Sequence, residues 1–216
     1  KQFIVPNGAP DLYVLNTNWF QVLRTGNFNR AEYTSTELSL RKRLHRNWQM
    51  FLSYTYSKAL GEAESFTDFL GNDPAASDIA PGFLDFDQRH ILKWQGVTHL
   101  PGELLLGATV QWASGLPYSL VSTVVDHDDF GNLSGRRTFF PTGVKNDERN
   151  EGQWLINARL EKRIHLGKWE GSAFLSGENL LDDDHLRVES YNLGQGAFDG
   201  TRSFGRRYEI GVALLY

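Results

Sequence analysis

The chain has 216 residues, contains no cysteine and carries a formal net charge of −4. The lack of cysteine excludes disulfide frameworks and cysteine-ligated zinc sites, and the acidic balance argues against nucleic acid as a main partner. The mean hydropathy is −0.41, and no apolar run approaches the roughly 20 residues that a membrane-spanning helix needs. Aromatic residues make up 13% of the chain, which favours β-strands.

Alternation between apolar and polar residues predicts an all-β, antiparallel fold of about eight strands. Residues 1–10 contain two prolines and a glycine and are expected to form a loop that enters the first strand. The strands are predicted at 11–24, 31–44, 47–60, 88–100, 103–120, 152–166, 168–180 and 204–216. Residues 1–216 are expected to form one unit, because no linker or low-complexity segment divides them.

The alternation fits two classes of protein. In 47–60, even positions from Trp48 to Tyr56 are apolar and most odd positions are polar. A soluble sandwich would bury this apolar face in protein, whereas a transmembrane barrel would turn it towards lipid. Runs of ~10 to 14 residues favour the barrel, because 9–11 residues suffice to cross a bilayer. Trp48, Trp154 and Trp169 are expected beside short turns, with Tyr54 and Tyr56 near the opposite end, as in aromatic girdles.

The connections between the strands are of two kinds. Tight turns are predicted at His45-Arg46, at Pro101-Gly102 and at Gly167, and long polar loops at 61–87, 121–151 and 181–203. Short turns on one side and long loops on the other are typical of bacterial outer-membrane barrels. The long loops are therefore expected to face outside, and the last strand to end on the periplasmic side.

The last eight residues fit the insertion signal of outer-membrane barrels. The signal positions are Glu209, Gly211, Leu214 and Tyr216. This pattern predicts recognition by the barrel assembly machinery and contact with outer-membrane lipid. An ordinary amphipathic strand that ends on an aromatic residue is the alternative.

Three groups of motifs follow one another along residues 30–216. They are Ala31-Glu32-Tyr33 with Leu38–Leu44 and Ser53–Ala59; Asp85–His90 with Gly96-Val97, Leu100-Pro101 and Ser114–Tyr118; and Asn157–Ile164 with Glu178–Leu181. In this order and spacing they resemble the C-terminal barrel half of TonB-dependent receptors. The resemblance is greatest to the Oar-like group with a carboxypeptidase regulatory domain.

The resemblance implies uptake of an external ligand through a plugged barrel of about 22 strands in the outer membrane of a Gram-negative bacterium. The chain contains no plug domain and no TonB box, so the TonB system would act only through a plug outside it. We therefore expect the C-terminal strands of a larger barrel. The alternative is a small plugless barrel that serves as a structural anchor, adhesin or partner-binding protein. Its interior would then hold a salt-bridged network of Glu37, Arg41, Arg43, Arg159, Glu161, Arg163 and Glu209.

No enzyme signature is present, so we expect no catalysis; the sequence lacks a Gly-x-Ser-x-Gly elbow, a His-Glu-x-x-His motif and a phosphate-binding loop. The best metal candidate is Asp126, Asp128 and Asn132, whose spacing is similar to the start of a calcium loop. Phe130 stands where a third ligand is expected, so a hydrated acidic loop is the alternative. No other cofactor is expected.

The predicted loop 61–87 is acidic and has no Lys or Arg. Its acidic residues are Glu62, Glu64, Asp68, Asp73, Asp78, Asp85 and Asp87. Such a loop could attract cations to the outer face or simply keep the barrel rim hydrated. Asp182–His185 allows the same two interpretations. Arg89 and His90, next to Asp85 and Asp87, are predicted to order the return into the next strand.

Overall fold

The structure is a computed structural model that describes residues 2–3, 12–13, 30–62, 64, 82–127, 133–167 and 169–215. Among these residues there is no helix of the length and apolarity needed to cross a membrane. The strands are β1 (Gln2–Phe3), β2 (Leu12–Tyr13), β3 (Ala31–His45), β4 (Trp48–Gly61), β5 (Gly82–Phe83), β6 (His90–Leu100), β7 (Leu104–Ala113), β8 (Pro117–His127), β9 (Leu133–Phe139), β10 (Glu148–Arg149), β11 (Gln153–Leu166), β12 (Trp169–Glu178), β13 (Leu186–Asn192), β14 (Ala197–Arg202) and β15 (Arg207–Leu215).

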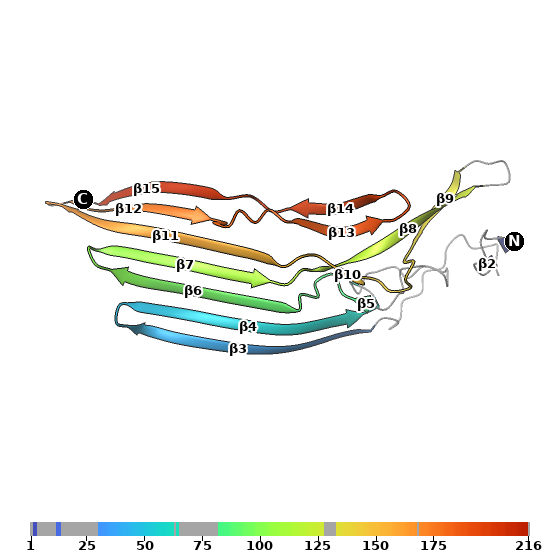
Figure 1. Cartoon of the computed structure of the whole chain (residues 1–216), viewed down its shortest axis with the longest axis horizontal. Helices are drawn as coiled ribbons and strands as arrows, with labels where there is room; N and C mark the ends of the chain where they lie inside the picture. The colour runs from blue at the N-terminus through green and yellow to red at the C-terminus, as the bar shows by residue number, and fades with distance from the viewer. Residues whose placement is uncertain are drawn as a thin grey trace, which may run out of the picture.

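The main sheet is an antiparallel meander in the order β15-β12-β11-β7-β6-β4-β3, with β5 added to the end of β4. The long strands lie side by side along the long axis of the molecule (Figure 1), and their tight turns gather at one end. The turns contain residues with positive φ, among them Asn47 (68°), Gly102 (81°) and Gly167 (66°). Asn and Gly tolerate this conformation best, which explains why the chain reverses at these positions. The tight turns predicted at Pro101-Gly102 and at Gly167 are confirmed, and the one predicted at His45-Arg46 lies one residue later, at Arg46-Asn47.

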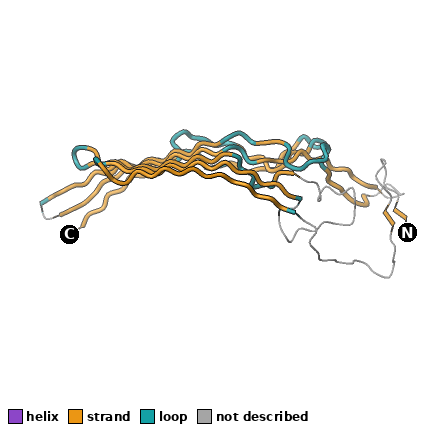
Figure 2. Tube along the Cα trace, turned by 90° about the horizontal axis from the view of Figure 1, so that it is seen from below, coloured by secondary structure: helices purple, strands orange, loops and turns teal. Residues whose placement is uncertain are grey.

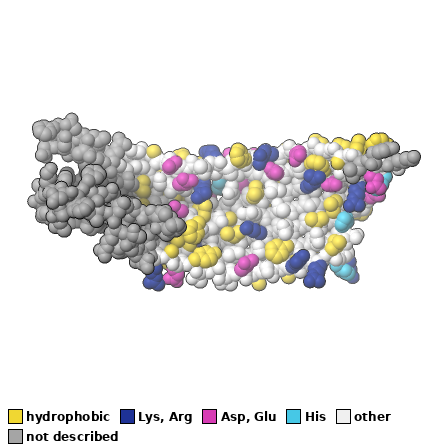
Figure 3. Space-filling model, turned by 180° about the vertical axis from the view of Figure 1, so that it is seen from behind, with side chains coloured by type: hydrophobic (Ala, Val, Ile, Leu, Met, Phe, Trp, Pro, Cys, Tyr) yellow, Lys and Arg dark blue, Asp and Glu magenta, His cyan; other side chains and the backbone are white. Residues whose placement is uncertain are grey.

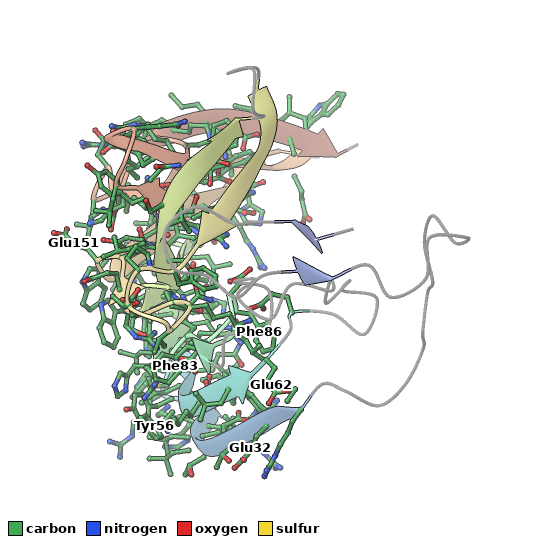
Figure 4. The ribbon with its side chains drawn as sticks, turned by 90° about the vertical axis from the view of Figure 1, so that its right-hand side faces the viewer. Glu32, Tyr56, Glu62, Phe83, Phe86 and Glu151 are labelled. Carbon is green, nitrogen blue, oxygen red and sulfur yellow. The ribbon has the colours of Figure 1, made fainter. Side chains whose placement is uncertain are left out.

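The sheet is curved and open. Seen from the side it forms an arch along the strands (Figure 2), and a view along the strands shows it curled into a trough (Figure 4). The free edges are β3 and β15. The all-β antiparallel prediction is confirmed, and the described residues form part of a barrel wall rather than a closed ring.

The strand register separates an apolar face from a polar one. Leu40, Leu52, Trp94, Val110 and Ile156 are cross-strand neighbours in one row. The adjacent row, on the opposite face, contains Arg41, Phe51, Gln95, Thr109 and Asn157. The polar face is concave, and charged side chains of both signs are spread over it (Figure 3).

The convex apolar face is exposed. Leu38, Ile210 and Val212 have 71%, 79% and 66% of their surface accessible. Within the described residues, the buried apolar side chains are only Ala59, Leu84 and Ala113. A soluble sandwich would cover the large apolar side chains with a second sheet. No second sheet covers them in the described part of the chain, so this face is suited to lipid.

The predicted strand 103–120 is two strands. The chain leaves the main sheet after Ala113, and β8 continues into a second sheet of order β10-β8-β13-β14, with β9 also paired to β8. The break lies at Gly115, where a Cβ atom would approach the carbonyl oxygen of Asn150 to 1.7 Å. The loops predicted at 121–151 and 181–203 therefore contain the hairpins β8–β9 and β13–β14 beyond the loop ends of the main strands. Of the predicted strand 11–24, only 12–13 lies within the described residues.

Candidate functional site

The concave face holds an open groove of about 650 Å³. It extends across the strands from β3 to β15, because the odd-numbered residues of β4, β6, β7 and β11 and the even-numbered residues of β12 point to this side. Its polar lining consists of Arg41, Lys42, Gln49, Gln95, Thr109, Asn157, Arg159, Ser176, Glu178 and Glu209. Amide, hydroxyl and charged groups together can hydrogen-bond a polar ligand, or another polar protein surface.

Arg159 is a groove cation with both an ion pair and an aromatic contact. Its Nη2 and Nε donate to Glu161 Oε2 at 3.0 and 3.3 Å, and its guanidinium lies 3.5 Å from the centre of the Phe174 ring. Alternation on β11 places Arg159 and Glu161 on the same face. Of the internal network predicted for a small closed barrel, this is the pair that forms within the described residues.

Asp87 forms a buried junction between the main sheet and the loop-end segments. Only 1% of Asp87 is exposed. Its carboxylate accepts hydrogen bonds from the Ala59 amide at 2.5 Å, from Arg89 Nε at 2.8 Å and from Arg149 Nη2. Arg149 also donates to the carbonyl oxygens of Asp87 and Gly115 at 2.8 and 3.3 Å. One carboxylate thus connects β4, β10 and the segment that enters β6.

The surroundings of Asp87 favour its ionised form. Burial alone raises the pKa of the Asp87 carboxyl, but the hydrogen bonds from Ala59, Arg89 and Arg149 outweigh this effect and hold the pKa below its ordinary value. The guanidinium carbons of Arg89 and Arg149 lie 4.4 and 5.1 Å from the centre of the Phe83 ring, which is labelled in Figure 4. The predicted role of Arg89 in ordering the return to the next strand is confirmed.

A second set of contacts adjoins this junction. The Asn146 amide group donates to the Phe83 carbonyl and to Asp85 Oδ1, both at 2.7 Å. Lys145 is paired with Glu64, which also accepts from the Asp85 amide at 3.0 Å. Glu64, Asp85 and Asp87 of the acidic loop therefore form specific contacts within the protein and are not simply hydrated. Asp68, Asp73 and Asp78 lie outside the described residues, and Glu62 is half-buried.

Asn179 forms a comparable junction at the end of β12. Asn179 is only 4% exposed. Its side-chain nitrogen, Nδ2, donates to the backbone carbonyls of Asp183 and Phe204 at 3.1 and 2.9 Å. Its side-chain oxygen, Oδ1, accepts from the backbone N–H of Asp183 at 3.0 Å. Asp183 in turn accepts from the Trp154 amide at 2.7 Å and contacts His185. Asp183 is thus a structural acceptor rather than a free surface charge.

Asn179→Ala is expected to lower the free energy of unfolding by about 2–3 kcal/mol, because it leaves buried backbone groups without partners. Asn47→Ala is the matched control, since both residues have positive φ (51° and 68°) but Asn47 is exposed in a turn. Urea unfolding of the full-length protein in lipid vesicles would measure both changes. Equal losses would show that backbone conformation, and not hydrogen bonding, explains the effect.

The aromatic residues form a row at the loop end of the convex face. His90 lies 5.2 Å from Tyr56 and 6.3 Å from Trp112, and Trp112 lies 6.1 Å from Trp154, between ring centres. Trp154 therefore belongs to the girdle at the loop end, and its predicted position beside a short turn was wrong. Trp48 and Trp169 begin β4 and β12, next to short turns, as predicted.

Two other predictions fall partly outside the described residues. Asp128 and Asn132 of the calcium candidate are not among them, and the side chain of Asp126 is not described. Within the described part, no group of three or more His, Asp or Glu side chains is arranged to hold a metal ion. Of the insertion signal, Glu209 and Gly211 lie on the concave side, Leu214 is 60% exposed, and Tyr216 lies outside the described residues.

The comparisons with known proteins agree with this geometry. No curated protein matches the chain. Among solved structures, the outer membrane transporter YddB from Escherichia coli is similar, with 14% sequence identity and a TM-score of 0.52. The match covers 87% of this chain but only 26% of YddB, and at this identity it concerns the fold alone.

The family comparison covers most of the chain. The model for "Outer membrane beta barrel domain" matches residues 5–163, well over half of the 216 residues. The match agrees with the exposed apolar face and the polar concave face, and it places the protein in the outer membrane. The chain belongs to the outer membrane β-barrel domain family.

Proposed function

We propose that the chain is the C-terminal barrel portion of a TonB-dependent transporter that takes up an external ligand. The observation that carries the proposal is the open sheet, whose edge strands β3 and β15 have no partner on their outer sides in the described part of the chain. In lipid, each unpaired backbone N–H or C=O costs several kcal/mol, so spanning sheets are closed. In the proposed barrel, further strands complete this wall.

The likeness to a large transporter fits a wide barrel better than it fits a small barrel. This chain spans 26% of the length of YddB, whose name describes an outer membrane transporter. The motifs that resemble TonB-dependent receptors include Asp85–His90, and Asp87 and Arg89 of this motif form the buried junction at the loop end. In the proposed function the polar groove faces the lumen, and the loop-end hairpins face outside.

The proposal includes no catalytic step and no resident cofactor. The TonB system would act on a plug domain, and this chain would supply part of the wall around it. The ligand would contact the loops and the concave face, where neutral amides and charges of both signs are available.

The alternative is a small plugless barrel that anchors or displays its loops. The hairpins β8–β9 and β13–β14 beyond the loop end favour it, because structured loops provide a rigid surface for a partner.

The native size of the protein separates the two functions. An antibody against residues 186–202 would detect the polypeptide in fractionated source cells. We expect a band several times larger than the 24.5 kDa of this chain in the outer membrane, and co-purification with TonB after crosslinking. A band near 24.5 kDa in the outer membrane would support the small barrel instead. Recovery in the soluble fraction would contradict both.

A further inference from the structure

Positive charge is concentrated at the turn between β3 and β4. Between Glu37 and Glu62 the sequence contains Arg41, Lys42, Arg43, Arg46 and Lys58 but no Asp or Glu. We call Lys42, Arg43 and Arg46 the basic turn patch, because these three lie within five residues at the turn end of the sheet. Arg41 is left out of the patch because it points into the groove, whose lining also includes Lys42.

No carboxylate of the described residues neutralises the charges of the basic turn patch. Arg43 and Arg46 are exposed, Lys42 is half-buried, and none of the three forms an ion pair with the described residues. The arginines at the loop end of the sheet differ from those of the basic turn patch, because most of them form ion pairs with carboxylates. The loop-end pairs are Arg89 and Arg149 with Asp87, Arg206 with Asp182, and Arg207 with Glu178.

Lys42 is held where a membrane surface would be. Its strand neighbour across β4 is Met50, so its stem lies on the convex apolar face. Its ammonium donates to the carbonyls of His45 and Trp48, both at 2.9 Å, and lies 3.7 Å from the centre of the Trp48 ring. This is the snorkelling arrangement of a cation at the border between lipid tails and headgroups.

Lys162 repeats the arrangement on β11. It is paired across the sheet with Leu104 on the same convex face, and its ammonium donates to the Gly102 carbonyl in the next turn. Trp48 and Trp169 are 40% and 47% exposed at this level, and Trp side chains prefer the interface. Lys42 and Lys162 thus lie at the depth of the lipid headgroups.

We propose that the basic turn patch binds the headgroups of anionic glycerophospholipids, such as phosphatidylglycerol, in the leaflet at the turn end. Clusters of Lys and Arg at a membrane surface attract anionic lipids, by a factor of roughly five for each charge. Leu40 and Leu44, 54% and 58% exposed beside the patch, offer apolar surface for acyl chains. A lipid satisfies both features, whereas a soluble anion would use only the charges. The inference rests on the family and the sheet, not on transport.

Tryptophan quenching by brominated lipids would test the proposal, because the Trp48 ring contacts Lys42 of the patch. The full-length protein would be reconstituted in vesicles of brominated phosphatidylglycerol with plain phosphatidylcholine, and in vesicles with the bromine on phosphatidylcholine instead. We expect an association constant about tenfold or more in favour of phosphatidylglycerol, which falls as salt is raised. The triple variant K42Q/R43Q/R46Q should lose most of this preference. Lys58→Gln, which removes an exposed lysine at the loop end of the same strand pair, should retain it.

The outcomes that overturn the proposal are distinct. Equal quenching by the two lipids in the unchanged protein would do so, as would an unchanged preference in the triple variant or a loss of preference in Lys58→Gln. Competition by soluble glycerophosphoglycerol at millimolar concentration would show an anion site rather than a lipid surface. Heat-modifiability on gels verifies insertion; where the triple variant does not insert, R43Q/R46Q, which keeps the Lys42 contacts, takes its place.

Discussion

Asp87→Ala is expected to lower the free energy of unfolding of the full-length protein by about 3–5 kcal/mol, the cost of removing one partner from a buried ion pair. The substitution leaves Arg89, Arg149 and the Ala59 amide without their shared acceptor. Because the junction connects β4 and β10, we also expect the loop-end segments to become sensitive to added protease. Urea unfolding in lipid vesicles and limited proteolysis of whole cells would measure the two effects.

The exposed pair Arg30 and Glu32 provides the control. Its charged atoms are 3.7 Å apart, and the side chains are 84% and 62% exposed. Glu32→Gln is therefore expected to change stability by less than about 1 kcal/mol. A loss as large as that of Asp87→Ala would show that burial is not the source of the effect.

The pH dependence of the Asp87 contribution has a defined sign. Hydrogen bonds lower the pKa of the folded state below the ordinary value of 3.8, so the unfolded chain binds the proton more readily. The contribution is fully present above the unfolded pKa and is lost as the pH falls through the folded one. The stability difference between the unchanged protein and Asp87→Asn should therefore be constant near neutral pH and shrink in acid. A difference that grows in acid would contradict this assignment.

Ile210→Arg is expected to destabilise the inserted barrel by about 2–4 kcal/mol, the cost of a lipid-facing arginine near the bilayer midplane. Ile210 is 79% exposed on the convex face and pairs with Leu175 on β12, which pairs with Leu160 on β11. An arginine there has no polar partner in the described part of the sheet and must reach towards a headgroup. The inserted fraction on heat-modifiability gels and the urea midpoint would both fall.

Thr109→Arg is the matched control on the concave face. Thr109 is exposed, and its cross-strand neighbours Gln95 and Asn157 are uncharged, so we expect little loss if this face borders a hydrated lumen. Val212→Arg should have an intermediate effect, because Val212 lies in the row that leads through Ala173 to Lys162 near the turn-end interface. Equal effects of Ile210→Arg and Thr109→Arg would mean that the convex face does not contact lipid.

The sequence by itself determined the strands of the wall and the class of the fold. Alternation with period two is a local property, and it shows in each strand whatever the neighbours are. Gly102 and Gly167 mark the turns for an equally local reason, since glycine readily adopts positive φ. The position of Trp154 at the loop end could have been predicted from the sequence, because a strand that follows a long loop begins at the loop end.

Only the tertiary structure decided how the loop end is organised. Asp87 and Arg149 are separated by 62 positions, and nothing in the residues around either one specifies their contact. The same is true of Asn146 with Asp85, and of β13 with β8, which pair in parallel across a distant part of the chain. An acidic residue in a polar loop has the same local pattern whether it is hydrated or buried. Its environment depends on segments distant in the sequence, because the fold alone brings a partner charge to it.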